Sequence, residues 1–185
     1  MVAGTHGGRR LAAPAGRSTR PTSDRVREAL FSALADVVPG ATVLDGYAGS
    51  GALGIEALSR GAATAVLVEH DGRTAAVARR NLHDLDLHDR GVVVAQDMAR
   101  WCRAPHPPGP FTLLLLDPPY AVALTEVFQR LADLRAAGAV AGGAAVVVER
   151  DRRDPGLDAE PPEFLLPGRR RVYGDTVLVS FLAAP

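Results

Sequence analysis

Lysine is absent from the sequence: all 21 basic residues are arginine, and 21 acidic residues balance them. Without lysine, the protein cannot be a Schiff-base enzyme, a pyridoxal-phosphate enzyme of the usual kind or a phosphate-loop NTPase. The zero net charge excludes a uniformly basic molecule that coats nucleic acid, but it leaves room for a local basic patch. Arginine, a permanently charged and planar cation, suits phosphates and base edges.

Cysteine, aromatic residues and long apolar runs are also scarce. The single cysteine, Cys102, excludes an internal disulfide and a multi-cysteine zinc site. The longest apolar stretches, such as residues 113–116, are far too short to cross a bilayer, and the N-terminal residues lack the apolar core of a secretory signal. We therefore expect a cytoplasmic protein without membrane contact. Because the charge is neutral and aromatic residues make up only 5% of the chain, nothing demands an oligomer, and we expect a monomer.

The length of 185 residues suits one globular domain. After residue 40, short runs that are apolar throughout alternate with helical patterns, which predicts an α/β protein with a mostly parallel sheet between helix layers. The predicted strands are residues 41–45, 65–69, 92–95, 111–117, 144–149 and 176–181. The predicted helices are residues 52–60, 73–83, 98–103 and 124–136. The tail from residue 169 is predicted to close as a β-hairpin.

Residues 1–21 are predicted to be a basic N-terminal extension without any acidic residue, and residues 22–185 to be the main domain. The main domain opens with a helix that Thr22 or Ser23 can cap. Positive charge concentrates in this part of the chain, where it could clamp the phosphates of a structured RNA or simply decorate a solvated tail. The candidate RNA contacts are Arg9, Arg10, Arg20, Arg25 and Arg27.

A glycine-rich loop joins the first predicted strand to a helix. Gly49, Gly51 and Gly54 match the dinucleotide fingerprint, and Glu69 ends the next strand, where a ribose-binding acid belongs. Taken alone, this loop fits any nucleotide-derived cofactor, including a nicotinamide one. The carboxylate of Asp45, beside the loop, would repel a pyrophosphate but attract the ammonium and sulfonium groups of S-adenosylmethionine (SAM). We therefore expect SAM as the cofactor and S-adenosylhomocysteine as its product.

Four further residues complete the predicted cofactor site. Tyr47 and Ser50 lie in the glycine-rich loop. Asp97 follows the third predicted strand, where its carboxylate could accept a hydrogen bond from an adenine amino group, with Met98 against the ring. A helix-capping role is the alternative for Asp97.

The strand of four leucines ends in Asp117-Pro118-Pro119-Tyr120. The two prolines remove backbone donors and stiffen the loop, so it presents carbonyl and carboxylate acceptors beside an aromatic ring. Such a corner suits a flipped nucleobase with an exocyclic amine. Hydrogen bonds to Asp117 and to the Pro118 carbonyl would make the amine nitrogen more tetrahedral and more nucleophilic, while Tyr120 stacks on the base. A purely structural turn is the alternative.

These residues together resemble the bacterial RsmD family, whose members are class I, SAM-dependent methyltransferases that modify the exocyclic N2 of a guanine in 16S ribosomal RNA. The resemblance covers almost the whole chain and depends on residues 8–11 (Gly-Arg-Arg-Leu), 20–28 (Arg-Pro-Thr-Ser-Asp-Arg-Val-Arg-Glu), 45–61 and 117–120. The segment 20–28 is the most specific to the family. One departure is Gly46, where the family usually has a larger residue.

The resemblance implies a three-layer, Rossmann-like class I methyltransferase fold with a seven-stranded, mostly parallel sheet and a C-terminal antiparallel hairpin. It also implies a small N-terminal β-hairpin that contacts RNA. The partner would be 16S rRNA, either free or within the small ribosomal subunit or its assembly intermediate. The roles it implies are SAM binding by Asp45, Gly49, Gly51 and Glu69, with Asp97 near the adenine, and guanine binding by Asp117 and Tyr120.

Three other functions stay open at this point. A DNA adenine-N6 or protein-glutamine methyltransferase uses a comparable Pro-Pro-aromatic loop. An NAD-dependent oxidoreductase could use the same three glycines, and a catalytically silent module could bind RNA alone. No metal site is predicted, because the spacing of His83 and His88 does not place them on one helical face.

Overall fold

The structure is a computed structural model that describes residues 1–14, 24–104 and 109–185. No helix within these three ranges is long and apolar enough to cross a membrane. The helices are α1 (Asp24–Ala33), α2 (Ala52–Ser59), α3 (Gly72–Asp84), α4 (Met98–Cys102) and α5 (Leu124–Ala136). The strands are β1 (Thr42–Gly46), β2 (Thr64–Glu69), β3 (Gly91–Ala95), β4 (Phe111–Leu116), β5 (Val140–Asp151), β6 (Leu165–Tyr173) and β7 (Thr176–Ala183).

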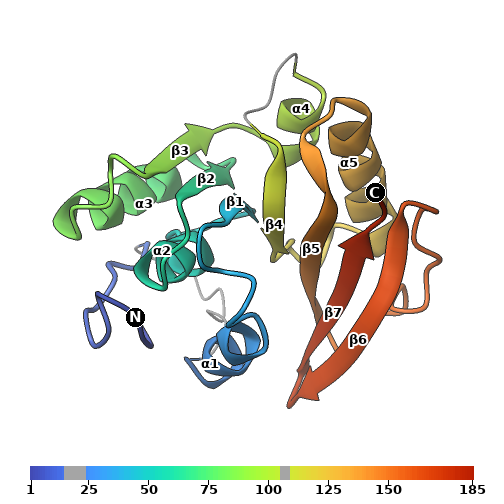
Figure 1. Ribbon diagram of the computed structural model, residues 1–185, viewed down its shortest axis with the longest axis horizontal. Helices are drawn as coiled ribbons and strands as arrows, with labels where there is room; N and C mark the ends of the chain where they lie inside the picture. Colours follow the sequence, from blue (N-terminus) through green and yellow to red (C-terminus); the bar gives the residue numbers. More distant parts are fainter. Residues whose placement is uncertain (15–23, 105–108) are drawn as a thin grey trace.

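The strands form one seven-stranded sheet in the order β3-β2-β1-β4-β5-β7-β6 (Figure 1). Strands β1 to β5 are parallel, and β7 runs antiparallel to both β5 and β6. This arrangement confirms the expected mostly parallel sheet with a C-terminal antiparallel hairpin. The strand order reverses between β1 and β4, and the carboxyl ends of strands at such a switch point are where α/β sheets bind ligands.

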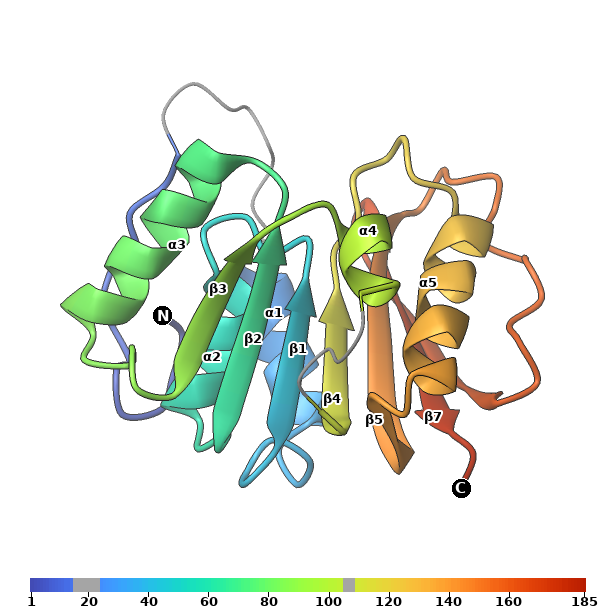
Figure 2. The same cartoon turned by 90° about the horizontal axis from the view of Figure 1, so that it is seen from above.

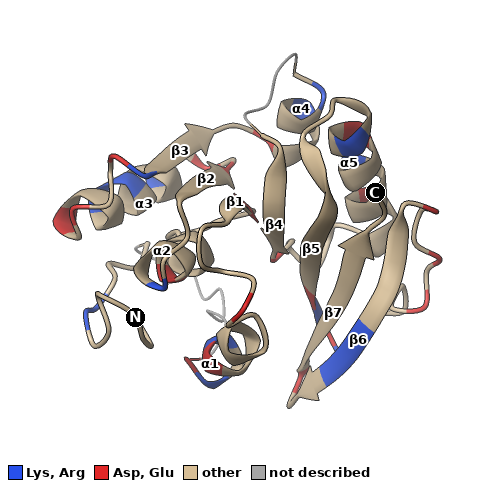
Figure 3. Cartoon of the chain, viewed as in Figure 1, with Lys and Arg blue, Asp and Glu red and all other residues tan. Residues whose placement is uncertain are grey.

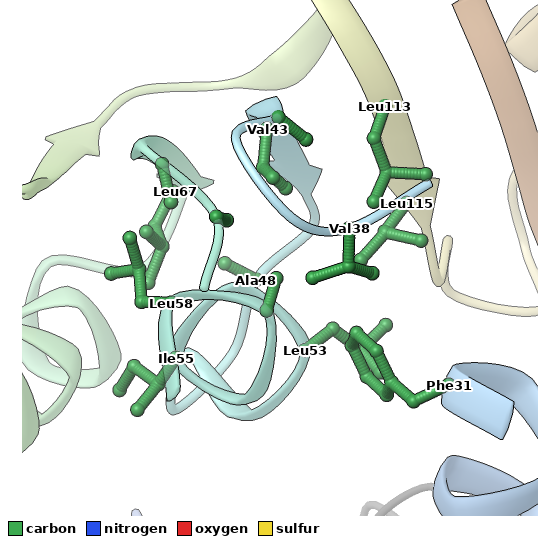
Figure 4. Close-up of a cluster of buried hydrophobic side chains, with 14 of the residues drawn as sticks. Phe31, Val38, Val43, Ala48, Leu53, Ile55, Leu58, Leu67, Leu113 and Leu115 are labelled. Carbon is green, nitrogen blue, oxygen red and sulfur yellow. The ribbon is translucent and has the colours of Figure 1, made fainter. Parts of the chain in front are cut away.

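Helices cover both faces of the sheet and make three layers (Figure 2). One buried cluster joins α1, α2 and α3 to one face through residues such as Phe31, Ile55 and Leu82 (Figure 4). A second cluster joins α4 and α5 to the other face through residues such as Trp101 and Leu131. Because β4 is buried on both sides, all four leucines face the core: Leu113 and Leu115 in the first cluster, Leu114 and Leu116 in the second.

The C-terminal hairpin is longer than predicted, because β6 begins at Leu165 rather than at residue 169. Pro167 and Gly168 are part of the strand, and a shift in register follows Pro167. Strand β6 lies at the edge of the sheet, where a proline is tolerated because one side of the strand needs no ladder partner. Turn-forming residues therefore mark a bulge here and not the start of the strand.

Residues 1–14 pack against α2 and α3 through buried polar side chains. Glu56 in α2 is fully buried and accepts hydrogen bonds from the backbone N–H groups of Val2, at 2.8 Å, and Ala3, at 2.9 Å. Asn81 in α3 accepts a hydrogen bond from the N–H of Ala12 at 2.8 Å and donates one to its carbonyl at 3.0 Å. Residues 1–14 contain turns and no strand, so this part of the chain does not form the expected β-hairpin. Residues 15–23, which include Thr22 and Ser23, lie outside the described residues.

Candidate active site

Three carboxylates gather at the carboxyl edge of the sheet around the switch point. Asp45 lies in β1, Glu69 ends β2, and Asp117 directly follows β4. Because β1 pairs with both β2 and β4, the three residues lie at the same end of adjacent strands: Asp45 pairs with Leu67 and Leu115, which are two residues before Glu69 and Asp117. Their charges interact, since both Asp117 and Glu69 raise the pKa of Asp45. The structure therefore brings these three predicted site residues together at one edge of the sheet.

Asp45 is the most buried of the three, with 1% of its surface exposed. Burial raises its pKa to about 7, and the repulsion from Asp117 and Glu69 adds to this effect. A hydrogen bond from the N–H of Gly54 to Oδ2, at 2.7 Å, acts in the opposite direction. Within the described part of the chain, Oδ1 is buried and has no hydrogen-bond partner. A buried acceptor in this state indicates a ligand that supplies a donor or a cation.

The glycine-rich loop folds over these carboxylates. The N–H of Gly49 donates a hydrogen bond to Glu69 Oε2 at 3.0 Å. Gly51 has φ 83° and begins α2, and a Cβ atom at this position would lie 2.6 Å from Cδ2 of Leu67. The loop backbone therefore lies directly against β2, in a left-handed conformation that glycine adopts without strain. Ser50, also in the loop, accepts a hydrogen bond at its carbonyl from Asn81.

Glu69 is 4% exposed and already has three local contacts. In addition to Gly49, its Oε1 accepts a hydrogen bond from the N–H of Asp71 at 2.8 Å and lies 3.0 Å from His70 Nδ1. These contacts fix the carboxylate at the end of β2, on the side of the glycine-rich loop. A carboxylate held in this way is suited to accept hydrogen bonds from the two hydroxyls of a ribose.

Asp97 and Met98 take different positions. Asp97 is exposed and caps α4, with Oδ1 accepting a hydrogen bond from the N–H of Arg100 at 3.0 Å, so the helix-capping interpretation is confirmed. Met98 is 3% exposed and packs beneath the loop: a Cβ at Gly46 would lie 3.1 Å from Met98 Cε and 2.5 Å from Leu116 Cδ2. Met98 therefore supports the site from within the core. The same packing explains why this chain has glycine at position 46.

The Asp-Pro-Pro-Tyr segment forms a rigid corner beside Asp45. The N–H of Asp117 donates to the carbonyl of Gly46 at 3.3 Å, and the N–H of Val122 donates to the carbonyl of Pro119 at 2.9 Å. Pro118 is buried, whereas Tyr120 is 71% exposed. A half-buried carboxylate next to an exposed aromatic ring is an arrangement that can hold a planar group with an exocyclic amine.

Two arginines support this region and have no recognisable signal in the sequence. Arg130 in α5 donates a hydrogen bond to the hydroxyl of Tyr47 and lies over its ring, 5.7 Å from the centroid. Burial raises the pKa of Tyr47 to about 12, although the charge of Arg130 lowers it. Arg150 in β5 is 5% exposed, forms an ion pair with Asp154 and donates to the carbonyl of Val122 at 2.8 Å, just after the Pro-Pro corner. Tyr47 itself has φ 65°, a conformation uncommon for a residue other than glycine.

The described arginines among the predicted RNA contacts belong to the N-terminal extension and to α1, both of which carry basic residues in Figure 3. Arg9 and Arg10 are exposed in the N-terminal extension, and Arg9 donates to the carbonyl of Asp84 at 3.2 Å. Arg25 is exposed on α1. Arg27 is 8% exposed and forms an ion pair with Asp24, which leaves it little room to reach a phosphate. The remaining candidate, Arg20, lies outside the described residues.

The sheet order, the glycine-rich loop after β1 and the acidic residue at the end of β2 define a class I methyltransferase fold. A family model described as conserved hypothetical protein 95 matches residues 1–182. Ribosomal RNA small subunit methyltransferase D of Escherichia coli (strain K12) is 38% identical over 176 residues, which cover 94% of this chain and 84% of the relative. The chain therefore belongs to the RsmD family of methyltransferases.

Two solved structures extend this likeness to the whole fold. The Escherichia coli protein yhhF has a TM-score of 0.86 and 30% identity, and the match covers 100% of this chain and 97% of that one. A protein of Thermus thermophilus has a TM-score of 0.79 and 34% identity, with 100% and 98% coverage. In the described residues, no group of three or more histidine, cysteine, aspartate or glutamate side chains could hold a metal ion.

Proposed function

We propose that the protein transfers a methyl group from SAM to the exocyclic N2 amine of a guanine in the 16S rRNA of the small ribosomal subunit. The observation that carries the proposal is the buried, unpartnered Oδ1 of Asp45 next to the Asp117-Pro118-Pro119-Tyr120 corner. The name of the Escherichia coli relative, a ribosomal RNA small subunit methyltransferase, supports the substrate. We expect the protein to act as a monomer in the cytoplasm, on rRNA that is free or in an assembling subunit.

The residues around β1 and β2 fit SAM. Asp45 Oδ1 would accept a hydrogen bond from the ammonium group, whose positive charge removes the cost of ionising a buried carboxylate. Glu69 would accept hydrogen bonds from the ribose hydroxyls, and Asp97 has an exposed carboxylate for the adenine amine. The loop from Tyr47 to Gly51, including Ser50, would lie along the cofactor. When bound, SAM supplies an electrophilic methyl group.

The Pro-Pro corner would prepare the guanine for reaction. Asp117 and the carbonyl of Pro118 would accept hydrogen bonds from the N2 amine, which makes the nitrogen lone pair available for attack on the methyl carbon. Asp117 would also stabilise the positive charge that develops on the nitrogen as the new bond forms, and the departing proton would pass to this carboxylate or to solvent. Tyr120, whose ring is exposed, would stack on the extruded base.

Labelled SAM tests this function directly. Small ribosomal subunits and free 16S rRNA that lack the modification are incubated with tritiated SAM, and the labelled nucleotide is mapped and identified as a nucleoside. We expect label on the N2 of a single guanine. Label on adenine N6 of DNA or on a protein glutamine would indicate one of the related methyltransferases, and calorimetric binding of NAD without binding of SAM would overturn the cofactor assignment.

A further inference from the structure

A groove opens between α1 and the β5-β7-β6 part of the sheet, on the face that α2 also covers. It holds a cavity of about 220 Å³. Helix α1 forms one wall, and the edge strand β6 forms the opposite wall. The residues that line it include Leu30 on α1 and Leu34 just after α1, Val147 and Leu178 on the floor, and Arg169 and Arg171 on β6.

The groove lies level with the candidate active site across the sheet, because Arg171 pairs with Leu178 and Leu178 pairs with Glu149. A small gap beside it, too small to hold a water molecule, shares Leu30, Val147 and Leu178 with this cavity. The gap is also lined by Leu53, Leu116 and Glu149. Leu53 follows the glycine-rich loop in α2, and Leu116 directly precedes Asp117. Val148, next to Glu149, pairs with Leu116, so the arginines on β6 lie across the sheet from the Pro-Pro corner.

The end of the groove at β6 carries two arginines without an ion-pair partner among the described residues. Arg171 pairs in register with Leu178, so it shares the face of β6 that borders the groove. Neither Arg169 nor Arg171 forms an ion pair within residues 1–14, 24–104 and 109–185. Arg170 differs, because its guanidinium pairs with Asp158 at 2.9 Å. Figure 3 shows this basic segment on the exposed edge strand.

The bulge in β6 orients the side chains of Arg169 and Arg171 toward the groove. The Ser180 hydroxyl accepts a hydrogen bond from the N–H of Arg169 at 2.8 Å and donates to the Arg169 carbonyl at 2.9 Å. Gly168 fits closely there, since a Cβ atom would lie 2.8 Å from Ser180. A bulge that is tied to the neighbouring strand re-aims the side chains that follow it. Arg169 and Arg171 both line the cavity as a result.

We propose that this groove binds the single-stranded RNA that flanks the target guanine, an inference that rests on the proposed methyl transfer to rRNA. Three strand spacings separate β4 from β6, about 14 Å, so nucleotides adjacent to a base at Asp117 reach the arginines. The apolar floor of Val147 and Leu178 accommodates base and ribose faces. The guanidinium groups of Arg169 and Arg171 pair with phosphates, which they match in charge and geometry.

The test compares two variants of the same strand. Arg169→Gln/Arg171→Gln removes the groove charges, and Arg170→Gln removes a charge that is paired with Asp158. The probes are fluorescent single-stranded fragments of 16S rRNA, including the fragment that contains the guanine mapped with tritiated SAM when methyl transfer occurs, and they are bound in the presence of S-adenosylhomocysteine at several salt concentrations. We expect the double variant to lose about tenfold or more in affinity, and its slope of log K against log salt to become shallower by about 1.4, as for two lost phosphate contacts on a single strand. Arg170→Gln should stay within about twofold of the unmodified protein.

A third variant tests the groove itself without changing charge. Ala33→Trp, at the exposed end of α1, fills the cavity and should weaken RNA binding while the salt slope stays unchanged. Cofactor affinity serves as the folding control for every variant.

The inference is overturned if the double variant binds and is active like Arg170→Gln. It is also overturned if that variant binds the RNA fragment normally and fails only on assembled subunits, because the groove would then contact a protein. If the protein binds RNA through the groove but transfers no methyl group, the proposed function is contradicted, whereas RNA binding by the groove is not.

Discussion

At the scale of single residues, Asp45 makes the stability of the protein depend on pH. Its pKa is raised to about 7 because the carboxylate is buried and faces two other acids. The folded state therefore retains a proton that the unfolded chain releases near pH 4, and this contribution to stability is lost as the pH rises from about 4 to 7. A cationic ligand bound beside Asp45 would offset this loss of stability, because it favours the ionised form of the carboxylate.

Replacing Asp45 with Asn tests this linkage. Asn keeps an acceptor for the N–H of Gly54 but carries no charge. The quantity to compare is the difference in the free energy of unfolding between Asp45→Asn and the original protein. We expect this difference to favour the variant more at pH 8 than at pH 4, by on the order of 2–4 kcal/mol. Urea unfolding at both pH values measures the difference, and an equal effect at pH 4 and pH 8 would contradict the assigned pKa.

The same carboxylate should control cofactor affinity. If SAM binds only to ionised Asp45, its affinity falls about tenfold per pH unit below pH 7, and Asp45→Asn should bind at least about 30-fold more weakly without this pH dependence. Calorimetric titration between pH 6 and pH 8 checks both results. A pH-independent affinity in the original protein would exclude Asp45 as the ammonium partner.

Asn81 connects the N-terminal extension to the cofactor loop. Its buried amide donates to the carbonyls of Ala12, at 3.0 Å, and Ser50, at 2.9 Å. Asn81→Ala leaves these groups without a partner, so we expect a loss of about 1–3 kcal/mol in stability and a weaker SAM complex. Urea unfolding and SAM titration measure the two effects. Unchanged SAM affinity in a destabilised variant would show that the contact to Ser50 does not position the loop.

At the scale of elements, the turn from β1 into α2 depends on a glycine. Gly51 combines φ 83° with a Cβ position only 2.6 Å from Leu67, whereas Gly174 has φ 60° in an open turn with no atom within 4 Å of its Cβ position. We expect Gly51→Ala to cost about 2–4 kcal/mol and Gly174→Ala about 1 kcal/mol, because only the first adds a steric clash to backbone strain. Thermal unfolding of both variants measures the difference, and equal costs would contradict the close packing of the loop on β2.

The sequence predicts most elements because each local pattern follows directly from a physical cause, such as burial on both faces of a strand. The leucines of β4 are apolar throughout since both faces are buried, and Pro-Gly, glycine and Asp-Pro signals bound the strands where they were expected. Prediction from the sequence fails where contacts between distant elements determine the position of a residue. Pro167 lies inside an edge strand, Met98 turns into the core beside Gly46, and Arg130 and Arg150 reach the site from distant elements without a recognisable motif.

At the scale of the whole molecule, a net charge of zero conceals an uneven distribution. The carboxylates Asp45, Glu69 and Asp117 gather at the switch point, and arginines remain exposed on the N-terminal extension and on β6. A cluster of carboxylates together with exposed arginines is the charge pattern that the proposed methyl transfer from SAM to RNA would require.

The proposed function requires Asp117 to activate a guanine amine at this corner. The most direct test is a single-turnover assay on unmodified 16S rRNA, with mass spectrometry of the nucleosides and with Asp117→Ala beside the original protein. We predict that N2-methylguanosine forms with the original protein, and that Asp117→Ala binds SAM but reacts roughly 100-fold or more slowly. An equal rate in both proteins, or methylation at another atom, would contradict the account.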